Sequence, residues 1–291
     1  MNRSVTQLAP PSTAPNGFAP VSGPERIATL DILRGFALFG ILVMNIQAFA
    51  MISAAYINPL AVPPVGNAEY AIWLVSHVFF DEKFITLFSM LFGAGIVLMT
   101  QRAEAAGNGA LALHYRRMVW LLVIGLIHAY LIWYGDILTA YALIGMVAVF
   151  MRNWSPRNLI AAGLGFLLLH FMIAAFMGFG ITQLPYEEVS ELEVFVWYPH
   201  DFYRVAEIAA YRGGFLEQLP IRIEQSLSMH LFVLPTDLLP YLLAVMAWGM
   251  AAFKSGLMTG EWSNRAYARL AVTGLALGLP LTALGVVMNE N

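Results

Sequence analysis

The residues of this chain best suited to acid–base chemistry are a histidine and an aspartate, His128 and Asp136. They belong to the stretch 117–151, in which two apolar runs are broken only at Tyr134-Gly135-Asp136. An ionisable side chain inside an apolar run of this length indicates a functional site, because charge in lipid is costly. A carboxylate that orients a histidine is the usual arrangement of a general base. We expect the break to fold Asp136 toward His128 and expect both to be catalytic; a histidine that only hydrogen-bonds within a helix bundle is the alternative.

Other polar side chains near this pair are candidates for substrate binding. Trp133 and Tyr141 follow His128 within about four turns of helix, and we assign both to the substrate. Lys83 begins another apolar run, at the same predicted membrane level as Asp136. We assign it to the substrate as well, with two arrangements open: it pairs with Asp136, or it only extends into water at the end of its helix.

The first apolar run, 27–52, carries Asp31, Arg34 and Asn45. At about 100° per residue, Arg34 and Asn45 lie within about 20° of one helix face, which is typical of a stripe that lines a pathway. We predict that all three bind substrate. In the alternative, Asp31 and Arg34 neutralise each other as an i, i+3 pair, and Asn45 hydrogen-bonds to another helix.

Composition defines the class of protein. Of the 291 residues, 59% are hydrophobic and 11% are charged, against about 25% charged in soluble domains. This predicts an all-α, polytopic membrane protein. The net charge of -3 argues against nucleic acid as a partner, and the absence of cysteine excludes disulfides and thiolate chemistry. No histidine pair has zinc-type spacing, so we expect no metal; His170 is assigned a structural role and His77 is ambiguous.

Seven membrane spans are expected, with a helix lying at the interface over 69–80 and two prolines, Pro235 and Pro240, that kink the sixth span. Most Lys and Arg residues outside the spans lie on the same side as the N-terminus, which the positive-inside rule places in the cytoplasm. The predicted spans are 27–52, 84–100, the two runs of 117–151, 158–182, 227–253 and 267–288.

The chain divides by composition into four segments. Residues 1–25, rich in Pro, Ala, Ser and Gly, are expected to form a disordered cytoplasmic tail. Residues 26–182 are the N-terminal bundle of five spans, and the acidic segment 183–226 is expected outside the cytoplasm, with helices on the membrane surface over 194–215. Residues 227–291 begin a C-terminal transmembrane region.

Three motifs in order resemble those of the YeiB-like bacterial membrane proteins, a family with a domain of unknown function. They are 26–37 with Asn45, 83–95, and 125–128 with Trp133, 135–138 and Tyr141. The resemblance implies a multi-pass protein of the bacterial inner membrane. The family continues into motifs of the GRMALTNY and GPxEWxWR kind, which this chain lacks up to Asn291, so we expect its C-terminal region to be incomplete.

The opening Asp31-x-x-Arg34-Gly35-x-Ala37 also resembles that of two groups of transmembrane acyltransferases, the acyltransferase-3 family and the lysosomal heparan-glucosaminide acetyltransferase family. The acyltransferase-3 pattern has a histidine where this chain has Asn45. The resemblance implies transfer of an acyl group from a cytoplasmic donor to an acceptor across the membrane. No tightly bound cofactor is implied; an acyl-CoA-type donor and a small-molecule or envelope-glycan acceptor are.

Three functions therefore remain open. In a transmembrane acyltransferase, Asp31 and Arg34 line an inner mouth for the phosphate of the acyl donor, and His128 acts as base toward the acceptor. In a small-solute transporter or permease, the same polar residues line the solute path. In a non-catalytic membrane scaffold, they only join helices to one another and membrane lipids are the partner.

Overall fold

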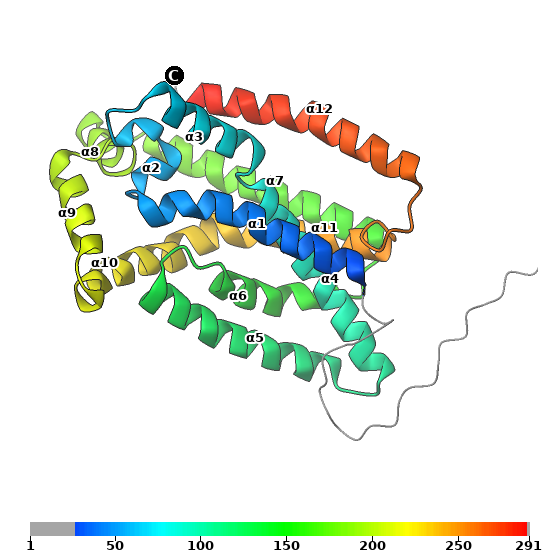
Figure 1. Cartoon of the computed structure of the whole chain (residues 1–291). Helices are drawn as coiled ribbons and strands as arrows, with labels where there is room; N and C mark the ends of the chain where they lie inside the picture. Colours follow the sequence, from blue (N-terminus) through cyan, green and yellow to red (C-terminus); the bar gives the residue numbers. More distant parts are fainter. Residues whose placement is uncertain (1–26, 290–291) are drawn as a thin grey trace, which may run out of the picture.

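The computed structural model describes residues 27–289, which form helices and no strands (Figure 1). The elements are α1 (Ala28–Ala50), α2 (Ala54–Ile57), η2 (Pro59–Ala61), α3 (Asn67–Phe79), α4 (Lys83–Ala105), α5 (Ala110–Ile127), the π-helical η3 (His128–Ile132), α6 (Leu138–Ala148), η4 (Val149–Met151), α7 (Pro156–Ile181), α8 (Tyr186–Val196), α9 (Asp201–Arg212), α10 (Phe215–Ser228), the π-helical η5 (Met229–Leu238), α11 (Leu239–Lys254) and α12 (Asn264–Asn289). The tail predicted over 1–25 lies outside the described residues.

Six helical stretches are long and apolar enough to cross a membrane, and α6 with η4 forms a shorter apolar one, Leu138–Met151. The prediction of an all-α polytopic bundle with about seven spans is therefore confirmed. Which side the N-terminus faces remains a prediction. The six stretches are Ala28–Ala50, Asn67–Ala105, Ala110–Ile132, Pro156–Ile181, Phe215–Lys254 and Asn264–Val286.

The core of the bundle is built around α11, which packs against α4 on one side and α7 on the other. Two glycines allow the α4–α11 contact. A Cβ on Gly93 would overlap the backbone of Met246, and one on Gly249 would overlap the backbone of Met90. The two helices therefore touch backbone to backbone, the close approach that small residues permit in membranes. Side chains of α11 such as Leu242 and Met246 are almost wholly buried.

The helix boundaries match the prediction at one place and differ from it at another. The separate helix predicted over 69–80 is α3, and a turn in which Glu82 has a φ of 59° separates it from α4. The sixth span was predicted to begin at residue 227, yet the helix runs unbroken from Phe215, because α10 continues directly into η5. Pro235 lies inside the π-helical segment η5, while Pro240 lies in the first turn of α11.

The bundle has two chemically different ends. The arginine-rich end (residues 102–117 and 152–157) holds the α4–α5 and α6–α7 connections, at the right of Figure 1. The opposite end (residues 45–66, 133–137 and 183–214) holds the short helices α2, α8 and α9, at the left. The C-terminal α12 lies along the outside of the bundle beside α3, with most of its apolar side chains exposed.

Candidate active site

His128 and Asp136 form a hydrogen-bonded pair at the opposite end of the bundle. The imidazole Nδ1 lies 2.9 Å from Asp136 Oδ1, and the Asp136 side chain is wholly buried while that of His128 is 31% exposed. The second carboxylate oxygen, Oδ2, accepts a hydrogen bond of 2.7 Å from the backbone N–H of Thr139 in the first turn of α6. Because a carboxylate only accepts, Nδ1 carries the proton and Nε2 is left as the basic nitrogen.

The chain reaches this geometry because α5 ends in a π-helical turn and then breaks. Within η3 the backbone widens at His128, and the N–H of Trp133 donates to the His128 carbonyl at 2.8 Å. The Trp133 ring then packs directly over Gly135, where any side chain would overlap the indole. This fold-back brings Asp136 to the imidazole, as predicted from the break. π-Helical turns of this kind are often found at functional sites.

Side chains of α10 hold the π-helical turn from outside. Ser226 Oγ donates to the carbonyl of Ala129 at 2.8 Å, and Arg222 Nη1 donates to the carbonyl of Leu131 at 2.8 Å. Both side chains are buried. The sequence gives no local signal for either contact, since the partners lie 97 and 91 residues away.

Two cavities adjoin the pair and share Ala48, Trp133 and Tyr134 as lining residues. The smaller, of about 500 Å³, is lined by Asp136 itself and by Asn45. His128 lines neither cavity, but its ring packs edge-on against the Trp133 indole with the centroids 6.3 Å apart. A ligand in either cavity is therefore one aromatic side chain away from the imidazole.

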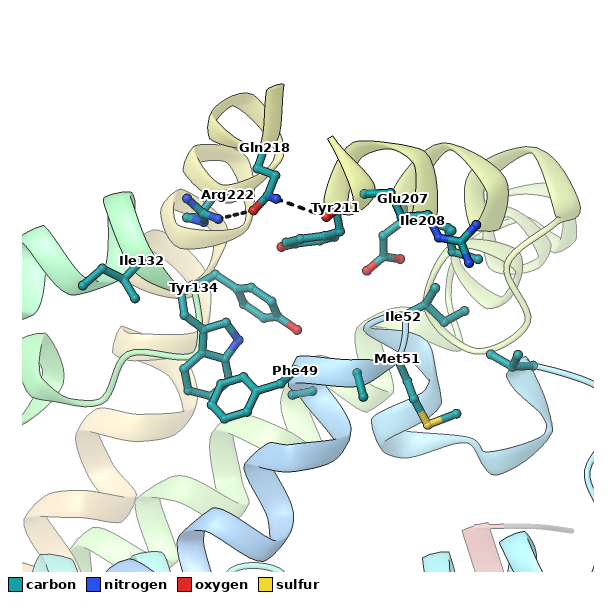
Figure 2. A pocket seen from close by; sticks show the side chains of 15 residues that line it. Phe49, Met51, Ile52, Ile132, Tyr134, Glu207, Ile208, Tyr211, Gln218 and Arg222 are labelled. Carbon is teal, nitrogen blue, oxygen red and sulfur yellow. Dashed lines mark hydrogen bonds between the residues drawn. The ribbon is translucent and has the colours of Figure 1, made fainter. Parts of the chain in front are cut away.

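The larger cavity, of about 670 Å³, has aromatic walls and a polar side (Figure 2). Tyr134 and Glu207 point into it from opposite sides. The Glu207 carboxylate accepts hydrogen bonds from Ser53 N at 2.9 Å and Ser53 Oγ at 3.3 Å. The indole Nε1 of Trp133 is buried and has no hydrogen-bond partner among the described residues. That N–H is available to a ligand that brings an acceptor.

Electrostatics keep the phenols at this end protonated. Burial, reinforced by the charge of Glu207, raises the pKa of Tyr134 to about 12. Burial also raises the pKa of Tyr211 to about 12, with Tyr134 and Glu207 adding to the shift. The Tyr211 hydroxyl donates a hydrogen bond to the side-chain oxygen of Gln225. At neutral pH Tyr134 is therefore a hydroxyl donor beside the pair.

The remaining predicted residues do not all converge on this site. Arg34 lines a separate cavity at the arginine-rich end, about 16 Å along α1 from Asn45. Its Nη1 lies 3.5 Å from Asp31 Oδ1, so the i, i+3 pair considered as the alternative is formed. Tyr141 lines no cavity described here: it is 1% exposed, and its hydroxyl hydrogen-bonds to Ser89 at 2.7 Å.

Lys83 does not pair with Asp136. Its Nζ donates to the backbone carbonyls of Asp81 at 3.0 Å and His77 at 3.4 Å, while both Asp136 oxygens are taken by His128 and Thr139. Of the two arrangements left open for Lys83, the pairing with Asp136 is not formed, because the turn before α4 offers the lysine nearer acceptors.

The other two histidines considered above both have polar neighbours. His77 is buried between two backbone carbonyls, those of Trp73 and Tyr56, each 2.8 Å from a ring nitrogen. His170 has no polar residue close to it in sequence. Its Nδ1 in fact lies 3.5 Å from Asp237 Oδ1, on a helix distant in sequence. Within residues 27–289, no three histidine, aspartate or glutamate side chains gather as metal ligands.

Comparison with known proteins finds relatives of which the chain matches only part of the length. The chain is 41% identical to the uncharacterized protein YxaH of Bacillus subtilis over 160 residues, 52% of this chain and 40% of that protein. It is 30% identical to the uncharacterized protein YeiB of Escherichia coli over 266 residues, 89% of this chain and 65% of that protein. The chain thus spans less than two thirds of the length of these relatives. No model of a protein family matches it, and no solved structure matches it. On these relatives, the chain belongs to the YeiB-like family of membrane proteins.

Proposed function

We propose that the protein is a transmembrane acyltransferase in which His128 is the general base. The observation that carries the proposal is the position of the Asp136 carboxylate. One of its oxygens accepts a hydrogen bond from the His128 imidazole, and the other accepts one from the Thr139 N–H of α6. A base held in this way keeps its proton on Nδ1 and presents Nε2 to an acceptor. The acceptor is a hydroxyl or amine bound in the cavities that share Trp133 and Tyr134.

The chemistry balances without a further group. As the acceptor oxygen or nitrogen bonds to the acyl carbon, its proton passes to Nε2 of His128. The bond between the acyl carbon and the leaving group of an acyl-CoA-type donor breaks, and the imidazolium returns the proton to that leaving group. The buried carboxylate of Asp136 stabilises the imidazolium while it exists. The Tyr134 hydroxyl can donate to the acyl oxygen or to the acceptor.

The opposite position of Arg34 supports a donor that crosses part of the bundle. Arg34 and Asn45 line cavities at the two ends of α1, about 16 Å apart along its axis. A donor with a phosphate-bearing head and an extended acyl arm fits such a separation. In this scheme Arg34 binds the head, and Asn45 lies at the acceptor end.

Mass spectrometry of envelope glycans and lipids tests the proposal. Cells that express the wild-type chain are expected to gain an acyl mass increment on an envelope component, which His128→Ala reduces at least about a hundredfold. His170→Ala is the matched control, because it removes another membrane histidine that contacts an aspartate. The proposal fails if no acyl increment depends on the wild-type chain, or if the increment survives in His128→Ala protein that is inserted at the wild-type level.

A transporter is the second candidate, favoured by cavities at both ends of one bundle. Phe88 and Phe92 on α4 line the cavity at the arginine-rich end, and the Tyr141 ring packs against them with centroids 5.8 and 5.0 Å apart. In a transporter, side chains of the bundle would have to move to connect the two cavities. Solute flux into proteoliposomes without any covalently modified product would favour transport over acyl transfer.

A further inference from the structure

A cavity of about 590 Å³ at the arginine-rich end is lined by cationic side chains from three helices. Arg34 comes from α1, Arg102 from α4 and Arg117 from α5, and no carboxylate is among the lining residues. The other polar lining residues are Asn108 and His114; the rest of the wall is mainly apolar, including Phe88, Phe92, Leu98, Met99, Leu113 and Met118.

The three arginines reach the cavity from different helices, and Asp31 partly neutralises the charge of Arg34. The Arg34 guanidinium lies across α4, where a Cβ on Gly95 would come within 3.2 Å of its Nη2. Arg117 reaches back to α4, with its Nη1 2.7 Å from Met99 Sδ. Asp31 lies 3.5 Å from Arg34 but outside the cavity lining. Three guanidinium groups around one space with no lining carboxylate favour an anion with several acceptor oxygens, and planar guanidinium groups match phosphate geometry.

A buried histidine gives an independent sign of a missing partner. His114 is wholly buried, and its Nε2 lies 3.0 Å from the carbonyl of Gly145. Because a carbonyl only accepts, Nε2 carries the proton. The other nitrogen, Nδ1, is buried without a hydrogen-bond partner among the described residues. A buried polar atom without a partner is destabilising, and a ligand hydroxyl, such as the P–OH of a phosphate, would satisfy it.

We propose that this cavity binds a phosphate or diphosphate group, with the apolar part of the ligand against the phenylalanine, leucine and methionine side chains. Arg34, Arg102 and Arg117 bind the phosphate oxygens, and His114 accepts from a protonated one. This inference rests on the proposed function in that the cavity is where the phosphate-bearing head of the acyl donor would bind, but phosphate binding itself does not require His128, which lies at the other end of the bundle. The ligand of the cavity is either the headgroup of an anionic lipid or a soluble phosphate compound.

Binding measurements on the purified full chain in nanodiscs test this site. In discs of neutral phosphatidylcholine, pyrophosphate is expected to bind the wild type and raise its melting temperature. Arg117→Gln should weaken binding at least about tenfold, since each lost charged contact is worth about 1.5–3 kcal/mol. Arg116→Gln is the matched control, because this neighbour on α5 does not line the cavity. His128→Ala should bind as the wild type does, which separates this proposal from the acyltransferase.

A second experiment tests whether the ligand is the headgroup of a lipid. In discs that contain phosphatidylglycerol, native mass spectrometry is expected to find retained lipid on the wild type and less of it on Arg34→Gln and Arg117→Gln, if the headgroup is the ligand. If pyrophosphate binds and no lipid is retained, the ligand is a soluble phosphate compound. The proposal is overturned if neither probe binds the wild type, or if Arg116→Gln loses as much binding as Arg117→Gln. Because the wild type is measured directly, failure of a variant to fold leaves the test valid.

Discussion

Within residues 27–289 the bundle contains two histidine–aspartate pairs, and they are built very differently. His128 and Asp136 are 2.9 Å apart with a wholly buried carboxylate, whereas His170 and Asp237 are 3.5 Å apart with a carboxylate that is 54% exposed. Asp136 is also fixed by the N–H of Thr139, while His170 Nδ1 makes no hydrogen bond of good geometry among the described residues. The difference teaches that proximity alone does not position a base; a second contact to the carboxylate does.

Removal of each carboxylate should separate the two pairs most strongly. Asp136→Ala removes the buried acceptor of both His128 and the Thr139 N–H, so we expect a loss of about 3 kcal/mol in the free energy of unfolding. Asp237→Ala should stay within about 0.5 kcal/mol, because exposed ion pairs contribute little. Thermal unfolding in detergent measures both. Equal losses would show that the two pairs do not differ in the way their geometry indicates.

A pair of glycine substitutions should sharpen the same contrast with a smaller effect. Gly125 precedes His128 on α5, and a Cβ there would come within 2.5 Å of Thr139 N. Gly125→Ala should push α5 from α6 and cost about 1–3 kcal/mol. Gly165, which precedes His170 on α7, has open space around it, so Gly165→Ala should be neutral or stabilising by up to about 1 kcal/mol. Melting temperatures in one detergent give the comparison; a stable Gly125→Ala protein would contradict it.

The smallest effect concerns Tyr134, the phenol beside the first pair. Glu207→Gln removes one cause of the high pKa of Tyr134, about 12, and should lower it while burial keeps it above the usual value of about 10. Since the folded pKa exceeds the unfolded one, stability is complete below pH of about 10 and falls as pH rises toward 12. Phenolate absorbance, compared with Tyr134→Phe, follows the titration. An unchanged pKa would exclude Glu207 as a cause.

Local pattern was enough to predict much of the fold. Long apolar runs gave the spans, and the short break at Tyr134-Gly135-Asp136 predicted the fold-back that joins Asp136 to His128. Both features depend on residues close in sequence, where helix geometry limits the outcomes. The α3–α4 turn was located for the same reason, because Asp81, Glu82 and Lys83 interrupt an apolar run.

The rest of the site depends on contacts between distant helices, which spacing cannot give. Asp237 approaches His170 across two helices, and Arg222 and Ser226 of α10 reach the carbonyls of η3. The helical face shared by Arg34 and Asn45 did not reveal that the two line separate cavities. Which cavity each residue lines depends on the helices packed against α1, such as α4, which lie far from it in sequence.

The backbone contact of α4 with α11 constrains how the molecule can move. α4 contributes residues to cavities at both ends, Phe84 at one and Arg102 at the other. Its middle, at Gly93, rests on the main chain of α11 with no side chain between to rearrange. Rotation or sliding at that crossing would drive one main chain into the other, so we expect α4 to keep its position relative to α11. We expect movement that links the two ends to involve other helices, such as α1, which meets α4 through the side chains of Phe84 and Arg34.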